Sequence, residues 1–189
     1  IHISRYKKVQ SDIKELVSIF VKDKLIEAIN RSDHTTNKYW IELRDIFTES
    51  FIQTTSSINK RKDLIDRFGH KFKEITWEEL VPHIKSTAMR ISIIQMNGNE
   101  KEVLDFKKNA EDNKYLNVIC IGGDKLSRGL TLDGLITSYY IRSTGNYDTL
   151  LQMGRWFGYK SKYIDICRIY TTKGLWGQFK KISIAVSEL

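Results

Sequence analysis

The chain has 189 residues, a formal net charge of +8, one proline and two cysteines. Its ordinary composition, without low-complexity runs, argues against disorder, and no apolar stretch approaches the roughly 20 residues needed to cross a bilayer. We therefore expect a globular cytoplasmic protein with no membrane contact. Because the chain lacks an initial Met and opens within a strand-like run, we expect it to be a segment of a longer protein. The positive charge favours a polyanionic partner such as DNA or nucleotide, with a merely basic surface as the alternative.

The first half of the chain shows apolar spacing typical of one strand followed by helices. Residues 1–4 form a strand-like run, and apolar residues from Val9 to Phe20 recur at helical spacing. The same spacing from Trp40 to Phe51 predicts a second helix. We expect the polar run at residues 54–57 to end that helix.

A third helix is predicted from the signal at its N-terminus. Thr76 and Glu79 have the spacing of a capping box, in which each side chain bonds the backbone N–H of the other residue. Pro82 lies too deep for an uninterrupted helix, so we expect a kink or two short helices. Residues 30–88 are therefore predicted to form a helical insertion between the first two strands.

The second half alternates strand-like and helix-like segments. The expected strands are 91–96, 117–121, 136–141 and 164–170, and the expected helices are 100–109, 147–157 and 174–189. Strands alternating with helices predict an α/β fold with a parallel sheet. Cys120 and Cys167 lie in two of these strands and are expected to be reduced core residues. Tyr139 and Tyr140 alternate along a strand, so one should be buried and the other should face away.

Two glycine–arginine pairs follow the central strands. The apolar run ending at Ile121 suits a strand covered on both faces, and Gly122 and Gly123 stop it. Arg128 follows a few residues later, and Arg155 follows the next strand and a helix. This order predicts two guanidinium groups at the carboxyl edge of a sheet, where α/β proteins bind ligands.

Several well-defined catalytic motifs do not occur in the sequence. It contains no GxxxxGKS/T phosphate loop, HExxH, paired CxxC or GxSxG. The four histidines are scattered through the first half and are interpreted as surface or packing residues. No complete catalytic constellation is present.

Two segments resemble motifs of superfamily-two helicases. Residues 123–132, GDKLSRGLTL, resemble motif five, T-D-x-A-A-R-G-L-D-I, and residues 150–159, LLQMGRWFGY, resemble motif six, Q-x-x-G-R-x-G-R. Together with DICRIYTT and the opening HISRYKKVQ, these blocks are similar to the Z-one (Z1) domain. That domain is found in helicase-like endonucleases of bacterial restriction and DNA-defence systems.

The resemblance implies a RecA-like lobe of the P-loop NTPase type, the C-terminal lobe of a helicase-like ATPase acting on DNA. ATP and Mg²⁺ would be bound mainly by a separate N-terminal RecA-like lobe that carries the phosphate loop. No residues of this chain are expected to hold the β-phosphate and Mg²⁺, so the chain alone should not hydrolyse ATP. No carboxylate cluster supports the nuclease assignment.

The resemblance assigns catalytic roles to three residues. Arg155 is the candidate arginine finger, because a planar, permanently charged guanidinium can stabilise charge on the γ-phosphoryl oxygens. Gln152 lies nearly one helical turn earlier and could orient Arg155 or a water. Arg128 could contact phosphate or a nearby carboxylate, with bonding to helix-end carbonyls as the alternative.

Further residues of the two motifs are candidates for contacting nucleotide or DNA. Gly129 allows close backbone approach, and Gly154 precedes the finger. Asp124 could hold the turn or pair with the arginines. The second arginine of motif six is replaced by Gly158, for which Lys160 is the candidate substitute. Ser127 and Lys125 are candidates for contacting nucleic-acid phosphate, with a turn or cap role as the alternative for Ser127.

Two functions of other classes remain open. A non-enzymatic DNA-binding module would use a broad basic face, formed by Lys60, Arg61, Lys62, Lys107 and Lys108. A protein-docking module would expose Trp40 and Phe51 on one stripe of the helical insertion.

Overall fold

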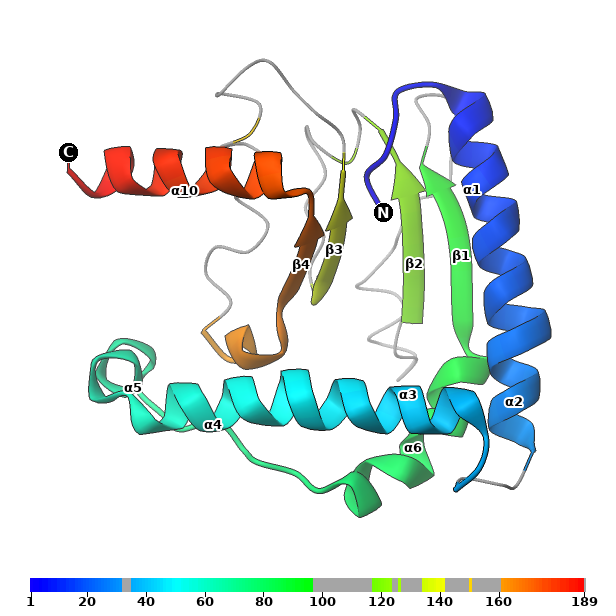
Figure 1. Ribbon diagram of the computed structural model, residues 1–189, viewed down its shortest axis with the longest axis horizontal. Helices are drawn as coiled ribbons and strands as arrows, with labels where there is room; N and C mark the ends of the chain where they lie inside the picture. Colours follow the sequence, from blue (N-terminus) through cyan, green and yellow to red (C-terminus); the bar gives the residue numbers. More distant parts are fainter. Residues whose placement is uncertain are drawn as a thin grey trace, which may run out of the picture. The chain divides into compact units, whose positions relative to one another are not determined.

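The computed structural model describes residues 1–31, 35–96, 117–123, 126, 134–141, 150 and 161–188. The chain divides into two units (Figure 1). We call the first the sheet unit; it comprises residues 1–14, 93–159 and 167–189. The second, the helical unit, comprises residues 15–92 and 160–166.

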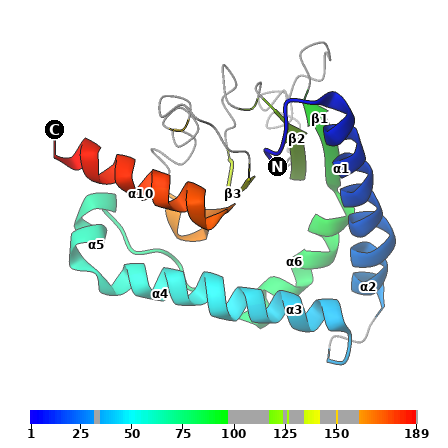
Figure 2. The same ribbon diagram turned by 45° about the horizontal axis from the view of Figure 1, so that its top comes forward.

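The described chain between residue 7 and the first full strand is mostly helical (Figure 2). Two of the helical runs contain a π-helical segment between two α-helical ones and pass through it without a break. The elements are α1 (Lys7–Ile19), η1 (Phe20–Ile26), α2 (Glu27–Asn30), α3 (Lys38–Ile46), η2 (Phe47–Ile52), α4 (Gln53–Lys60), α5 (Lys62–Phe68) and α6 (Trp77–Met89). In the described part of the chain, no helix is long and apolar enough to cross a membrane.

The strands form two small sheets. The strands are β1 (Ile91–Met96), β2 (Asn117–Gly122), β3 (Thr137–Tyr140) and β4 (Arg168–Thr171), and helix α10 (Lys173–Ser187) follows β4. β1 pairs with β2, and β3 pairs with β4 in parallel, with Thr137 opposite Arg168. The chain is thus α/β, as the alternation of segments predicts.

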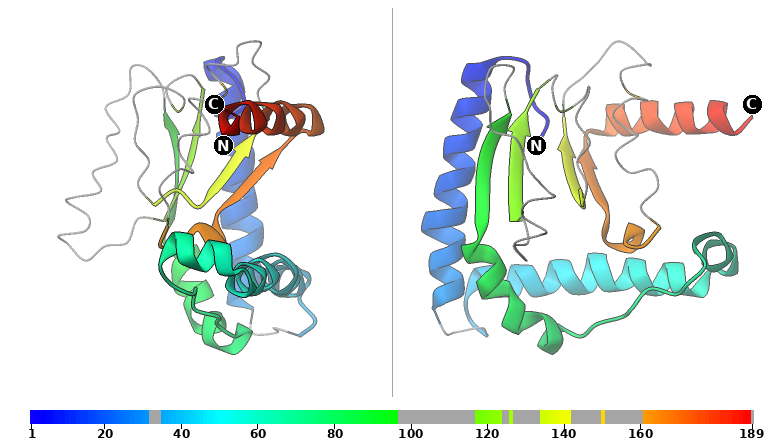
Figure 3. Two further views of the ribbon diagram at one scale, coloured as in Figure 1. Left: turned by 90° about the vertical axis from the view of Figure 1, so that its left-hand side faces the viewer. Right: turned by 180° about the vertical axis from the view of Figure 1, so that it is seen from behind.

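The first two residues lie between the two sheets (Figure 3). His2 forms parallel bridges with Gly122 of β2 and with Tyr140 of β3. Its N–H donates to the Tyr139 carbonyl at 2.8 Å, and the Gly122 N–H donates to the Ile1 carbonyl at 3.1 Å. The strand predicted at residues 1–4 is therefore a two-residue link, and it gives the spatial order β1, β2, residues 1–2, β3, β4.

The core of the sheet unit lies between β3 and α10. Tyr140, Leu150 and Leu175 are buried there, and Phe179 and Ile182 pack against them. Tyr140 is 1 % exposed and Tyr139 is 44 % exposed, which confirms the predicted alternation along this strand. α10 therefore packs one face on β3 and presents the other to solvent.

The core of the helical unit is separate and contains only apolar helix faces. Ile29, Trp40 and Ala88 are buried at its centre, and the Trp40 and Trp77 rings meet edge to face with centroids 6.2 Å apart. Since Trp40 is 2 % exposed, the docking stripe expected to include it is not available on the surface. Its aromatic ring contributes to packing instead.

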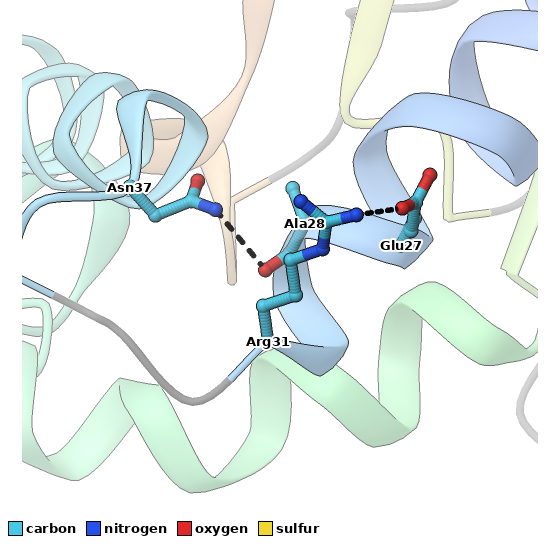
Figure 4. A network of polar contacts seen from close by, with 4 residues as sticks. All are labelled: Glu27, Ala28, Arg31 and Asn37. Atoms are coloured by element: carbon cyan, nitrogen blue, oxygen red, sulfur yellow. Dashed lines mark hydrogen bonds and ion pairs between the residues drawn. The ribbon is translucent and has the colours of Figure 1, made fainter.

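The connection from α2 to α3 is held by polar contacts (Figure 4). The Asn37 side chain accepts a hydrogen bond from the Tyr39 N–H and so caps α3. The same side chain donates to the Ala28 carbonyl, while Arg31 pairs with Glu27 one turn earlier. One side chain thus bonds both α2 and the start of α3.

The predicted capping box is confirmed, whereas the alternative of two short helices is wrong. The Thr76 hydroxyl accepts from the Glu79 N–H at 3.2 Å, and Glu79 accepts from the Thr76 N–H at 2.7 Å. α6 runs as one element through Pro82. The proline removes a single intrahelical hydrogen bond, and Trp77 and Val81 of this helix pack against the core, which offsets that loss.

Two other expectations about element ends are also wrong. The polar run at residues 54–57 does not end its helix, because α4 continues through it. Thr54 donates its hydroxyl to the Ser50 carbonyl one turn earlier at 2.7 Å, and Thr55 donates to the buried Asp165 carboxylate at 3.0 Å, so both hydroxyls are bonded without interrupting the helix. The strand expected at residues 164–170 begins only at Arg168, because residues 164–166 form a short 3₁₀ turn. The predicted helices 100–109 and 147–157 lie outside the described residues, apart from Leu150.

Candidate functional site at the carboxyl edge of the sheet

The predicted site residues lie outside the described part of the chain. They are Asp124, Lys125, Ser127, Arg128, Gly129, Gln152, Gly154, Arg155 and Lys160. Their positions and contacts therefore stay predictions. The described residues that lead into these segments do have a defined geometry, and they belong to the sheet unit.

The ends of two neighbouring strands lie at one edge of that unit. β2, residues 1–2 and β3 are paired side by side, and both bridges of His2 are parallel. Because parallel strands end at the same edge, the carboxyl ends of β2 and β3 lie at one edge, on either side of residues 1–2. The segment with Arg128 begins after β2, and the segment with Arg155 begins after β3.

His2 joins the two strands at this edge. Its Nε2 lies 2.7 Å from the Gly123 carbonyl, so in this contact Nε2 carries the proton and donates it. The ring stacks on Tyr140, with centroids 5.0 Å apart and planes 11° from parallel. His2 is 1 % exposed. Its role is thus to link the end of β2 to β3, in agreement with its interpretation as a packing residue.

Gly122 and Gly123 lie so close to neighbouring atoms that a Cβ would not fit, in addition to their role in ending the strand. A Cβ on Gly123 would lie 2.5 Å from the Ser4 carbonyl oxygen and 2.8 Å from Gln10 Nε2. A Cβ on Gly122 would lie 2.8 Å from the Leu126 side chain. Only glycine lets the end of β2 pass this close to the loop that follows residues 1–2.

That loop is held by two glutamine side chains. Gln10 Nε2 donates to the Ser4 carbonyl at 2.7 Å, and Gln95 Nε2 donates to the Lys7 carbonyl at 3.1 Å. Gln10 is 3 % exposed, and its Oε1 has no hydrogen-bond partner in the described part of the chain. Backbone groups of the loop are thereby fixed beside Gly123, which gives the edge a defined framework.

Burial disfavours the reactive thiolate form of the cysteine near this edge. Cys120 lies in β2, two residues before Gly122, and burial raises the pKa of its thiol. A raised pKa lowers the fraction of reactive thiolate at neutral pH. Cys120 and Cys167 are both free thiols, as expected, but both are half-buried and not core residues, and Cys167 lies just before β4 and not within it.

The basic cluster predicted in the helical insertion lies at the junction of α4 and α5. Lys60, Arg61 and Lys62 are all exposed, but Arg61 pairs with Asp63 at 2.6 Å. This pair holds the pKa of the Asp63 carboxyl below its usual value, mainly through the hydrogen bond from Arg61. One of the three positive charges is therefore neutralised locally. Lys107 and Lys108 lie outside the described residues.

Trp176 is an exposed aromatic residue that the sequence did not single out. Trp176 of α10 is 56 % exposed, although its neighbour Leu175 is 4 % exposed. The available signal was the helical spacing of Leu175, Phe179 and Ile182, which places their buried face away from Trp176.

Comparison with known proteins gives one match. A family model described as the Z1 domain matches residues 1–189, the whole chain. No curated protein and no solved structure matches the chain.

Proposed function

Because the chain belongs to the Z1 domain family, we propose that it is the C-terminal RecA-like lobe of a helicase-like ATPase that acts on DNA. In this proposal the ATP site is shared with an N-terminal lobe that carries the phosphate loop. The chain contributes a motif-five segment after β2 and the arginine finger of motif six after β3. The proposal concerns the whole protein, so this lobe alone is inactive.

The observation that carries the proposal is the parallel insertion of residues 1–2 between β2 and β3. Residues 1–2 therefore separate β2 from β3, and the carboxyl ends of both strands lie at the same edge. The segments that carry Arg128 and Arg155 each begin at that edge. Open α/β sheets bind their ligands outside the carboxyl ends of strands, at the point where the strand order reverses.

The chemistry requires little more of this lobe than well-placed positive charge. Phosphoryl transfer develops charge on the γ-phosphoryl oxygens, and an arginine finger that stabilises it contributes about 10³ to 10⁵ in rate. Arg155 has this role in our proposal, with Gln152 orienting it. Arg128 binds phosphate or a carboxylate of the site, and Lys160 supplies the second positive charge of motif six.

The proposal assigns ATP-bound Mg²⁺ to the other lobe. Within the described ranges, no group of three or more His, Cys, Asp or Glu side chains could hold a metal ion. The sequence also lacks the Ser or Thr of a phosphate loop that would coordinate the ion. In this proposal the chain supplies positive charge for charge stabilisation, and the other lobe holds the metal ion.

The test measures steady-state ATP hydrolysis by the intact protein that contains this domain. Arg155→Ala should lower kcat by about 10³-fold or more, and Arg155→Lys should restore only part of it because lysine lacks the planar fork. Arg67→Ala, a matched change at an exposed arginine of α5, should leave kcat unchanged. Equal kcat for Arg155→Ala and wild type would contradict the proposal.

A second candidate function is a non-enzymatic DNA-binding module. It is favoured by Lys60 and Lys62, which are exposed and have no carboxylate within ion-pair distance in the described part of the chain. For such a module we expect a Kd for DNA that depends strongly on salt concentration. The Kd should rise when both lysines are replaced by Glu. ATPase activity that depends on Arg155 would rule out this module as the sole function.

A further inference from the structure

The solvent face of α10 combines an exposed indole with exposed lysines. Trp176 is 56 % exposed, and Lys173 and Lys180 are exposed three residues before it and four residues after it. Residues three and four apart share one face of a helix. The indole therefore lies between the two lysines along one stripe, and Ile184, which is 49 % exposed, continues it by one turn.

The lysines of this face have no acidic partner in the part of the chain that the structure describes. Neither Lys173 nor Lys180 has a carboxylate within ion-pair distance in the described ranges, and Lys181 on the same helix has none either. From Lys173 to Ser187 the helix contains three lysines and no acidic residue. An apolar protein partner would have to desolvate these ammonium groups, whereas a polyanion would pair with them.

The packing of α10 does not account for the exposed indole. Leu175, Phe179 and Ile182 form the buried face against Tyr140 and Leu150. Trp176 is exposed and is not part of that buried cluster, and a Cβ added to Gly174 or Gly177 beside it would meet nothing within 4 Å. The backbone next to the indole is therefore open to close approach by a flat ligand.

We propose that this face of α10 binds single-stranded DNA, with a base stacked on Trp176 and phosphates paired with Lys173 and Lys180. Base–aromatic stacking flanked by positive charge is how sequence-tolerant proteins hold single strands. The two lysines are about 10 Å apart along the helix axis, seven residues at about 1.5 Å each, so they reach different phosphates. The choice of DNA as the polyanion rests on the proposed function, but the ATP site takes no part in this binding.

Stacking requires an unpaired base, and this decides between single strands and duplex. A base within a duplex is already stacked on both faces, so only its phosphates would be accessible to α10. The indole should therefore contribute to the binding of single strands and not to that of a blunt duplex.

The test is the fluorescence anisotropy of an end-labelled oligothymidylate of about 15 nucleotides, titrated with the 189-residue chain. Trp176→Ala should raise Kd by roughly 5- to 150-fold, and Trp176→Phe should recover most of the affinity. The charge reversal Lys173→Glu with Lys180→Glu should reduce the slope of log K against log salt by about 1.4, two phosphates at about 0.7 each.

The matched control reverses two exposed lysines of η1. Lys22→Glu with Lys24→Glu makes the same change in net charge at a distance from α10 along the chain and should leave Kd nearly unchanged. An equal loss in both double variants would overturn the proposal, because non-specific attraction to net charge would explain it. Unchanged Kd in Trp176→Ala would overturn it too, as would an equal effect of that change on a blunt duplex.

A separate measurement tests whether this face binds a protein partner instead. If Trp176→Ala converts a self-associated chain into a monomer on size exclusion without changing the Kd for the oligonucleotide, the face binds a second copy and the proposal is wrong. Binding is measured without ATP, so a failure of the ATPase proposal leaves this result intact, and the reverse also holds.

Discussion

The interactions that stabilise the sheet unit internally differ from those that stabilise the helical unit. In the sheet unit, His2 contacts Gly123, a residue 121 positions later, and stacks on Tyr140. In the helical unit, the core around Trp40 consists of helix faces whose apolar spacing is visible in the sequence. The first arrangement depends on one close backbone approach, whereas the second depends on apolar volume and helix caps.

This difference shows where function can be placed. Open α/β sheets bind their ligands outside the carboxyl ends of strands, and the sheet unit has a framework fixed by close approach at such an edge. A helical core with capped ends stabilises itself and tolerates change on its surface. We therefore expect substitutions in the two units to act separately, and the following predictions test that separation from the largest effect to the smallest.

The largest effect is expected at Trp40. Trp40→Ala removes the largest side chain of the helical core and should lower the free energy of unfolding by about 3–5 kcal/mol. Peptide-level hydrogen exchange should show faster exchange in α2, α3 and α6 and little change in β2 and β3. Equally faster exchange in both units would show that they unfold as one cooperative body and would contradict their expected independence.

A smaller effect is expected at Gly123. Gly123→Ala places a Cβ 2.5 Å from the Ser4 carbonyl oxygen, so the backbone must shift, at a cost of about 1–3 kcal/mol. Urea unfolding measures the change, and hydrogen exchange should locate it in the sheet unit. Gly177→Ala is the matched control, because its Cβ meets nothing within 4 Å, and it should be neutral or slightly stabilising. Equal stability of the two variants would contradict the close approach.

The cap of α6 should contribute about 1 kcal/mol. Thr76→Ala removes the hydroxyl that accepts from the Glu79 N–H, and such caps contribute about 0.5–2 kcal/mol. Thr76→Ser keeps the hydroxyl and should retain most of the stability in the same urea titration. If serine destabilises as much as alanine, packing of the methyl group and not capping is the cause.

The smallest effect on stability is expected at the exposed pair of Arg61 and Asp63. Arg61→Ala removes the hydrogen bond that lowers the pKa of Asp63, so the pKa should rise towards its ordinary value in a titration followed by NMR. A lowered pKa in the folded state adds stability above the ordinary pKa that is lost as the pH falls. Because both side chains are exposed, solvent screening should leave the unfolding midpoint unchanged. A clear shift of the midpoint would show that the pair helps to hold the α4–α5 junction.

Local signals in the sequence predicted the elements that depend on neighbouring residues. The capping box at Thr76, the strand at residues 91–96 and the alternation of Tyr139 with Tyr140 all follow from spacings within one element. The polar run at residues 54–57 misled because the Thr55 hydroxyl bonds Asp165, 110 residues away. A long-range partner of this kind leaves no local pattern.

The framework of the candidate site was only partly predictable for the same reason. Gly122 and Gly123 were predicted to end β2, but their close approach to Ser4 depends on the insertion of residues 1–2 between two sheets. The exposure of Trp176 depends on which face of α10 packs on β3. Arg128 and Arg155 were predicted from motif resemblance, and their geometry stays a prediction.

The most direct test of the ATPase proposal is single-turnover hydrolysis of ATP by the intact protein, with nucleotide affinity measured in parallel. For Arg155→Ala we predict a hydrolysis rate lower by about 10³-fold or more, with the Kd for ADP changed only a few-fold, because the finger acts on the γ-phosphoryl group in the transition state. A wild-type hydrolysis rate in Arg155→Ala, or a loss explained wholly by weaker nucleotide binding, would contradict this account.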